Sequence, residues 1–319
     1  MNKFTLNLND TMIWNQLEFV EFLADRQGLD IVVDTNAEGV CCRSSGIYDL
    51  IDKFDFNSVT IVTDNVAETH PTYNISFIPN KFRFLQVPAD TDYAKYHTWN
   101  TQKLFGAFYN RPTWQRLGLA SVLLAKYPGM SQVNFRQDPN IEDQRNYFEL
   151  DRLFLAHPES VKYFGQIYNQ FPLILEQHKD FQVGVLPQTF TDQIAEFYTN
   201  FLIELVAETF CTGRTFFPTE KSTKPMLLQK PFITMGPRNF LIHLRQLGFC
   251  TFHDFWDEGY DGHEGLHRYI KILELIDSLA NKSIKELDAM YQAMQPVLEH
   301  NYRLLVERAY TTKVTYVEA

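Results

Sequence analysis

The chain has 319 residues, of which 45% are apolar and 21% are charged, which indicates about two folded domains and excludes a disordered or collagen-like chain. Its formal charge of −10 argues against a nucleic-acid polymer or an anionic membrane as partner. The longest apolar stretch, at 117–125, is far shorter than the ~18 residues of a spanning helix, so we expect no membrane span. The cysteines, Cys41, Cys42, Cys211 and Cys250, show no CxxC spacing and no secretory leader precedes them, so we expect a cytoplasmic protein.

The first hundred residues alternate between helical and strand patterns. The expected elements are helices at 14–23 and 47–54 and strands at 30–34, 58–63, 73–78 and 82–87. Because helices and strands alternate along the chain, this segment predicts a parallel sheet.

The pattern restarts near residue 100, where we expect a domain boundary. A strand at 103–109 is followed by a turn and by a helix at 113–125, with Pro112 near its start, where a missing N–H is harmless. The later elements are expected at 141–154, 158–171, 262–280 and 283–295 for helices and at 201–207 and 231–235 for strands. A last helical pattern runs onward from Pro296, which should kink or divide it.

These patterns predict an α/β fold with two Rossmann-like domains that face each other across a cleft. The N-terminal domain is expected at 1–100 and the C-terminal domain at 101–280. The final helices, at 281–319, are expected to cross back and brace the N-terminal domain.

The most informative stretch is a strand, a loop and a helix start between residues 204 and 227. A helix N-terminus after a sheet strand suits a phosphate, and Lys221 and Lys224 add positive charge there. A carboxylate such as Glu220 or Glu208 beside them suits a ribose diol. The alternative is that Thr219 only caps the helix and Glu220 occupies its favourable first turn.

The sequence ELVAET…FFPTEKSTKPMLLQKPFITMG, at 204–236, resembles the nucleotide-sugar motif of α-1,3-fucosyltransferases. In that family F-E-N-[ST] precedes [VI]-T-E-K, a helix and a strand that ends in glycine. Related bacterial and phage glycosyltransferases are more similar still, because they share the tail LR-x-LGF-x-TF-x-x-[FW]-x-DE-x-YD, found here at 244–261. The resemblance covers about 200–280 and implies the two-domain GT-B architecture.

The resemblance implies that Glu220 contacts the nucleoside ribose and that Lys221 contacts the diphosphate. The family's Glu-Asn element falls on Glu208 and Thr209, so Thr209 stands where the family has asparagine. The spacer from there to Thr219 is also a few residues longer than in the family.

A second family element, a run of S-N-x(n)-R after a strand, resembles FYNRPTWQR at 108–116. Arg116, or failing that Arg111, would then pair with the leaving phosphate, whose oxygens an arginine fork matches bidentately. The alternative for Arg116 is a solvated helix residue.

The resemblance implies metal-independent, inverting transfer of a sugar from a nucleoside-diphosphate donor, with a GDP-sugar favoured, to a glycan or other hydroxyl acceptor. No further cofactor is required. The reaction needs a carboxylate base, which in the family follows a strand of the N-terminal, acceptor-binding domain. Asp64 and Glu68 after the 58–63 strand are the candidates, with Glu38 behind them. Each has the alternative of being an ordinary loop acid.

Two other function classes stay open. The run His263-Glu264-Gly265-Leu266-His267 is an H-E-x-x-H motif, which on a helix suits a zinc metallohydrolase, with Glu286 at a plausible spacing for a third ligand. Against zinc, the motif lies at the start of its helix, and Glu286 already belongs to a capping box with Ser283. The second alternative is a non-catalytic relative that binds a glycan or a partner.

The acidic run near residue 257 offers another metal option, but it contains no D-x-D after a strand. We expect a solvated cluster with two aromatic side chains packed beneath it. The acids are Asp254, Asp257, Glu258 and Asp261, and the aromatic residues are Trp256 and Tyr260.

Charge is distributed unevenly along the chain. The segment 93–136 carries +6 and the segment 209–253 carries +5, although the whole chain is acidic. These are the two segments that the resemblance assigns to one diphosphate, so a small anionic donor in a focused pocket is compatible with the acidic average.

Overall fold

The chain forms two compact units in the computed structural model, which describes residues 2–6, 16–35, 39–65, 67–78, 93–109, 112–135, 144–170, 173, 192–213 and 215–314. Unit 1 comprises Met1–Arg83 together with Thr212–Phe217, and unit 2 comprises Phe84–Cys211 and Pro218–Ala319. The boundary that we expected near residue 100 falls inside unit 2. The sequence pattern did not indicate that unit 1 includes a second segment.

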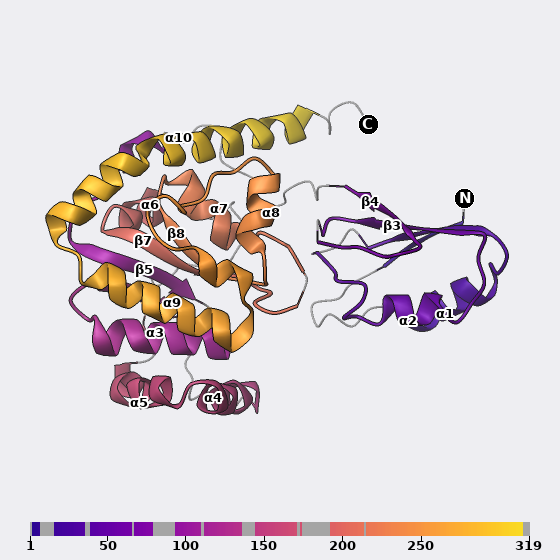
Figure 1. Ribbon diagram of the computed structural model, residues 1–319, viewed down its shortest axis with the longest axis horizontal. Helices are drawn as coiled ribbons and strands as arrows, with labels where there is room; N and C mark the ends of the chain where they lie inside the picture. Colours follow the sequence, from indigo (N-terminus) through magenta and orange to yellow (C-terminus); the bar gives the residue numbers. More distant parts are fainter. Residues whose placement is uncertain are drawn as a thin grey trace. The chain divides into compact units, whose positions relative to one another are not determined.

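Unit 1 is built on a parallel sheet in the order β1-β2-β3-β4 (Figure 1). Its elements are β1 (Lys3–Thr5), α1 (Gln16–Ala24), β2 (Asp30–Asp34), α2 (Ile47–Ile51), β3 (Ser58–Thr63) and β4 (Asn74–Phe77). β2 and β3 have the bounds that the sequence predicted, whereas β1 is too short to show alternation and was missed. The expected strand at 82–87 lies outside the described residues.

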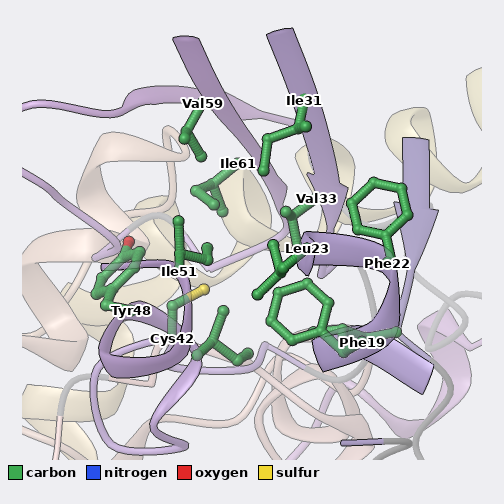
Figure 2. Close-up of a cluster of buried hydrophobic side chains, with 12 residues drawn as sticks. Phe19, Phe22, Leu23, Ile31, Val33, Cys42, Tyr48, Ile51, Val59 and Ile61 are labelled. Atoms are coloured by element: carbon green, nitrogen blue, oxygen red, sulfur yellow. The ribbon is translucent and has the colours of Figure 1, made fainter. Parts of the chain in front are cut away.

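The core of unit 1 packs α1 and α2 against one face of this sheet (Figure 2). Ile31 and Val33 of β2 are buried, whereas Val32 between them is partly exposed, as the two-residue period of a strand requires. The buried cluster consists of Leu6, Phe19, Phe22, Leu23, Ile31, Val33, Cys42, Ile47, Tyr48, Ile51, Val59 and Ile61.

Unit 2 has a second parallel sheet, in the order β6-β5-β7-β8. The strands are β5 (Lys103–Tyr109), β6 (Ser131–Phe135), β7 (Phe201–Ala207) and β8 (Phe232–Met235). The two central strands are buried on both faces, which explains their nearly continuous apolar sequences and why both were predicted. β6 was missed because its sequence, SQVNF, is mostly polar; it becomes a strand by pairing with β5, and α3 packs against it.

The strand order of unit 2 reverses between β5 and β7. Ligands of open parallel sheets bind beyond the carboxyl ends of the strands at such a switch point. β5 ends at Tyr109 and β7 ends at Ala207, so the segments that follow these two residues border the expected binding edge of unit 2.

Helices cover both faces of the unit 2 sheet (Figure 1). α3 and α9 lie on one face, with α4 and α5 packed outside α3, and α6 and α7 lie on the other, with α10 outside α7. The α-helices are α3 (Trp114–Lys126), α4 (Gln144–Ala156), α5 (Pro158–Ile167), α6 (Asp192–Tyr198), α7 (Glu220–Leu227), α8 (Phe240–Gln246), α9 (Gly265–Ala280) and α10 (Ile284–Val314). Short 3-10 turns lie at Ala94–Tyr96, Tyr168–Gln170 and Gly259–Gly262.

The last helix differs from the expectation. Pro296 does not divide α10, which runs on past it. Buried side chains before and after the proline, Met294 and Leu298, anchor both halves in unit 2, and this packing offsets the missing hydrogen bond. Ser283 and Glu286 form the predicted capping box at the start of α10. Within the described part of the chain, each helix is too short or too polar to cross a membrane.

Candidate functional site

Arg116 on α3 reaches the carboxyl end of β7, at the switch point of the unit 2 sheet. It is 4% exposed, and its Nη2 atom donates to the carbonyl oxygens of Ala207 at 3.0 Å and Glu208 at 3.2 Å. Arg116 is therefore not a solvated helix residue. It fixes the backbone from which Glu208 and Thr209 project. Arg111 lies outside the described residues.

Glu208 follows β7 directly and accepts three hydrogen bonds from the start of α7. The donors are the backbone N–H of Thr219 at 3.1 Å, its hydroxyl at 2.5 Å and the Ser222 hydroxyl at 2.5 Å. Thr219 also caps the helix, because its hydroxyl accepts from the N–H of Lys221. Since Glu208 is 1% exposed, its negative charge stabilises the helix N-terminus from inside the protein.

The Nζ atom of Lys221 brings the predicted donor-binding residues together. It lies 2.7 Å from Glu220 Oε1, 3.3 Å from Thr219 Oγ1 and 3.4 Å from Thr209 Oγ1. Thr209 is exposed, and the side chains of Lys221 and Glu220 keep 20% and 14% of their surface exposed. The cluster therefore lies at the surface, beside the carboxyl end of β7.

Two further ionisable residues, Lys224 of α7 and Glu204 of β7, act electrostatically on this cluster. Burial alone would raise the pKa of Glu220, but Lys221 and Lys224 outweigh it and hold that pKa below its ordinary value. Burial lowers the pKa of Lys224, although Glu220 and Glu204 act in the opposite direction. Glu204, in the middle of β7, is 4% exposed, and the sequence pattern did not predict a role for it. The signal available was a single acid inside the apolar strand FLIELVA.

The base candidates of unit 1, Asp64 and Glu68, follow β3 and are each 6% exposed. Asp64 Oδ1 accepts from the N–H of Gly39 at 2.9 Å. Glu68 accepts from the N–H of Cys42 and from the Tyr48 hydroxyl, both at 2.8 Å. Both carboxylates therefore hold the loop between β2 and α2.

Asp64 and Glu68 are both buried side chains that follow β3, so both stay candidates for the base. Glu38 lies outside the described residues.

The H-E-x-x-H motif does not form the arrangement of zinc proteases. α9 begins at Gly265, so His263 precedes the helix with an extended backbone and Glu264 is the N-cap residue. The ring centroids of His263 and His267 are 6.4 Å apart. Within the described ranges, histidine, cysteine and acidic side chains form no cluster of three able to hold a metal ion.

The acidic run near residue 257 is only partly solvated. Asp254 and Asp257 are exposed, but Glu258 accepts from the N–H of Phe252 at 2.7 Å and from the hydroxyl of Thr251 at 2.7 Å. It also lies 3.1 Å from Arg245. These motif residues hold the turn after α8.

Asp261, the last acid of the run, is buried, and this corrects the expectation of a solvated cluster. It is 4% exposed, accepts from the backbone N–H of Leu241 at 3.0 Å and pairs with Arg268 at 3.0 Å. Trp256 and Tyr260 are buried, as predicted. The sequence pattern did not reveal Arg268, because an arginine on an amphipathic helix is expected at the surface.

Comparisons of the chain with protein-family models, with curated proteins and with solved structures gave no match.

Proposed function

We propose that the chain is a glycosyltransferase that moves a sugar from a nucleoside-diphosphate donor, with a GDP-sugar favoured, to a glycan or other hydroxyl acceptor. One observation carries the proposal. Thr209, Thr219 and Glu220 converge on the ammonium of Lys221 beside the carboxyl end of β7, next to the switch point of the sheet. The resemblance to fucosyltransferases marks the same four residues.

The chemistry of the donor explains why this set of groups is suitable. When the bond to the sugar breaks, negative charge grows on the leaving diphosphate, and preorganised cations stabilise it. Lys221 and Lys224 supply that positive charge, and Glu220 is placed to accept from the ribose hydroxyls. Arg116 positions the backbone that carries Thr209, because its guanidinium donates hydrogen bonds to the carbonyl oxygens of Ala207 and Glu208.

Unit 1 would bind the acceptor, in the two-domain cleft architecture of such transferases. Inverting transfer requires a carboxylate to take the proton of the acceptor hydroxyl. Asp64 and Glu68, which both follow β3, are the candidates for this base.

Calorimetric titration with GDP, UDP, CMP and their sugars tests the donor site. We expect Lys221→Ala to weaken diphosphate binding about tenfold or more, since a charge-assisted hydrogen bond to phosphate is lost. Lys271→Ala is the matched control, because it removes a lysine from an exposed ion pair with Glu274. If no nucleotide binds the wild-type chain, or if both variants bind equally well, the proposal is wrong.

A second measurement separates the two roles assigned to the site. Glu220→Ala should weaken the binding of the free nucleoside as well as the diphosphate, because both contain the ribose. Lys221→Ala should weaken only the diphosphate. Equal losses for both ligands in both variants would contradict the assigned roles. Measuring the zinc content of the purified chain tests the hydrolase alternative.

A further inference from the structure

Two buried side chains, one from each unit, hold the short segment of chain that leads into α7. Asn65, which follows β3 in unit 1 and is 1% exposed, accepts from the backbone N–H of Phe216 at 2.9 Å. Glu208, in unit 2, accepts from the backbone N–H of Thr219 at 3.1 Å. The chain passes from unit 1 to unit 2 between Phe216 and Thr219. The segment is therefore held by one unit at its start and by the other at its end.

This segment has little freedom between its two ends. Residues 215–219 are all buried, and Pro218 among them has a fixed φ. Thr219 at its end caps α7, and its hydroxyl oxygen lies 3.3 Å from the Nζ atom of Lys221. A displacement of Phe216 would therefore reach the start of α7 and the cluster around Lys221.

On its unit 1 side, the segment contacts the loop that Asp64 holds. A Cβ at Gly39 would lie 2.5 Å from the Cβ of Phe217, so the side chain of Phe217 occupies the space beside this glycine. Asp64 Oδ1 accepts from the N–H of Gly39 at 2.9 Å. Asn65 is the next residue after Asp64 in the chain. The contacts of the segment thus lead to one of the two candidates for the base.

The alternative for Asn65 is a local role in the turn after β3. Its Oδ1 atom also accepts from the N–H of Ala67, and its own N–H donates to the hydroxyl of Thr63, both at 3.1 Å. Asparagine commonly stabilises turns by bonds of this kind. The bond to Phe216 joins residues 151 positions apart, and the turn does not need it.

We propose that Asn65 is a positioning residue of the donor site, which couples the binding of a nucleoside diphosphate at Lys221 to the loop that Asp64 holds. It acts through Phe216, because it fixes the chain three residues before the cap of α7. Coupling between two sites is reciprocal, so a bound diphosphate should in turn hold that loop more firmly. This inference rests on the proposed function, because it assigns a positioning residue to the same site.

The first test uses the full chain and the nucleoside diphosphate, GDP or UDP, that binds the wild-type chain more tightly. Asn65→Ala should raise its dissociation constant about threefold to tenfold, the range that a lost hydrogen bond allows. Val33→Ala is the matched control, because it truncates a buried side chain in the core of unit 1 and leaves the bond to Phe216 in place. It should bind with wild-type affinity. Equal dissociation constants for the two variants would overturn the inference.

Two insertions separate coupling from the stability of unit 1. Two glycines between Phe217 and Pro218 leave Asn65 and Glu208 in place but add slack between them, so affinity should fall as in Asn65→Ala. Two glycines after Gly213, where the chain is exposed, add the same length outside the held segment and should leave affinity unchanged. Equal affinities for the two insertion variants would show that the segment transmits nothing.

Hydrogen exchange measures the reciprocal effect. The diphosphate should slow amide exchange in the wild-type chain at 39–42 of unit 1 as well as at 221–223 of α7. In Asn65→Ala it should slow exchange at 221–223 alone. A purely local role of Asn65 would not change the response of 39–42 to the nucleotide. If the nucleotide leaves exchange at 39–42 unchanged in the wild-type chain, the inference fails even when Asn65→Ala does not fold.

Failure of the inference differs from failure of the proposed function. If Lys221→Ala weakens the diphosphate but Asn65→Ala and the insertion before Pro218 do not, the donor site stands and the inference alone is overturned. If no nucleotide binds the wild-type chain, the proposed function and the inference both fail.

Discussion

Arg268 and Asp261 form a buried ion pair that joins three elements of unit 2. Arg268 Nη2 lies 3.0 Å from Asp261 Oδ1, and the guanidinium also donates to the carbonyl oxygens of Thr234 and Pro237. Asp261 in turn accepts from the N–H of Leu241 at the start of α8. The pair thus connects α9, the end of β8 and the start of α8.

Replacing Arg268 with methionine should destabilise the chain by about 3–5 kcal/mol, because Asp261 would remain buried without its cation. Urea unfolding followed by tryptophan fluorescence measures the change. Lys271→Ala, which breaks an exposed pair with Glu274, should leave the unfolding midpoint close to that of the wild-type chain, because solvent screens exposed ion pairs. Equal unfolding midpoints for these two variants would contradict the structural role of Arg268.

Glu208→Gln should loosen the first turn of α7. Glutamine keeps one acceptor oxygen for three donors, so we expect a loss of about 1–3 kcal/mol. The readout is amide hydrogen exchange at 221–223, which should become faster. Ser283→Ala, which removes the cap of α10, should cost about 1 kcal/mol and leave those amides unchanged. Unchanged exchange at 221–223 in Glu208→Gln would show that α7 does not depend on this carboxylate.

We expect Lys230 to make the free energy of unfolding of the chain depend on pH. It is fully buried, its Nζ atom donates to the Thr98 carbonyl oxygen at 2.5 Å, and burial lowers its pKa to about 7. The unfolded chain therefore binds more protons than the folded chain between pH 7 and about 10.5, and stability rises with pH over that window. The slope contributed by Lys230 approaches about 1.4 kcal/mol per pH unit.

Lys230→Met should remove this slope. Urea unfolding at pH 7.5, 8.5 and 9.5 checks it, and the variant should gain most over the wild-type chain at the lowest pH. Lys285→Met, at an exposed position of α10, should retain the wild-type slope. A slope unchanged by Lys230→Met would mean that Lys230 keeps its charge when the chain folds.

Gly106 is required where β5 passes β7. A Cβ at this position would lie 2.6 Å from ring atoms of Phe201, so Gly106→Ala should destabilise the chain by about 1–3 kcal/mol. Gly165 in α5 has open space around its missing Cβ, and Gly165→Ala should stabilise by about 0.5–1 kcal/mol. Thermal unfolding of both variants tests the contrast, and shifts of the same sign would contradict it.

Strands buried on both faces were the easiest elements to predict. β5 and β7 have the same bounds as the strands predicted from the sequence. A short uninterrupted apolar run is typical of a strand that is buried on both faces. β1 and β6 were missed. β1 has only three residues and β6 has a mostly polar sequence, so neither differs from a loop in sequence, and each becomes a strand by pairing with a neighbour. Pro296 was expected to interrupt a helix, but tertiary packing outweighed the local preference.

The candidate site was predictable in part. Lys221 and Glu220 stand out because they open a helix after a strand, which is a local pattern. Glu204, Arg268 and the burial of Asp261 depend on contacts between elements distant in sequence. A single sequence shows the type of each side chain but not which opposite charge folding will bring beside it.

The Thr212–Phe217 segment belongs to unit 1 but is synthesised long after the N-terminal segment of that unit. Phe216 and Phe217 are buried there, the N–H of Phe216 donates to Asn65 Oδ1 at 2.9 Å, and Phe217 packs against Gly39. A ribosome adds about 5–20 residues per second, so on the order of ten seconds separate the emergence of the N-terminal segment from that of Phe217. The unit that is translated first therefore receives its last segment only after more than half of unit 2 has been made.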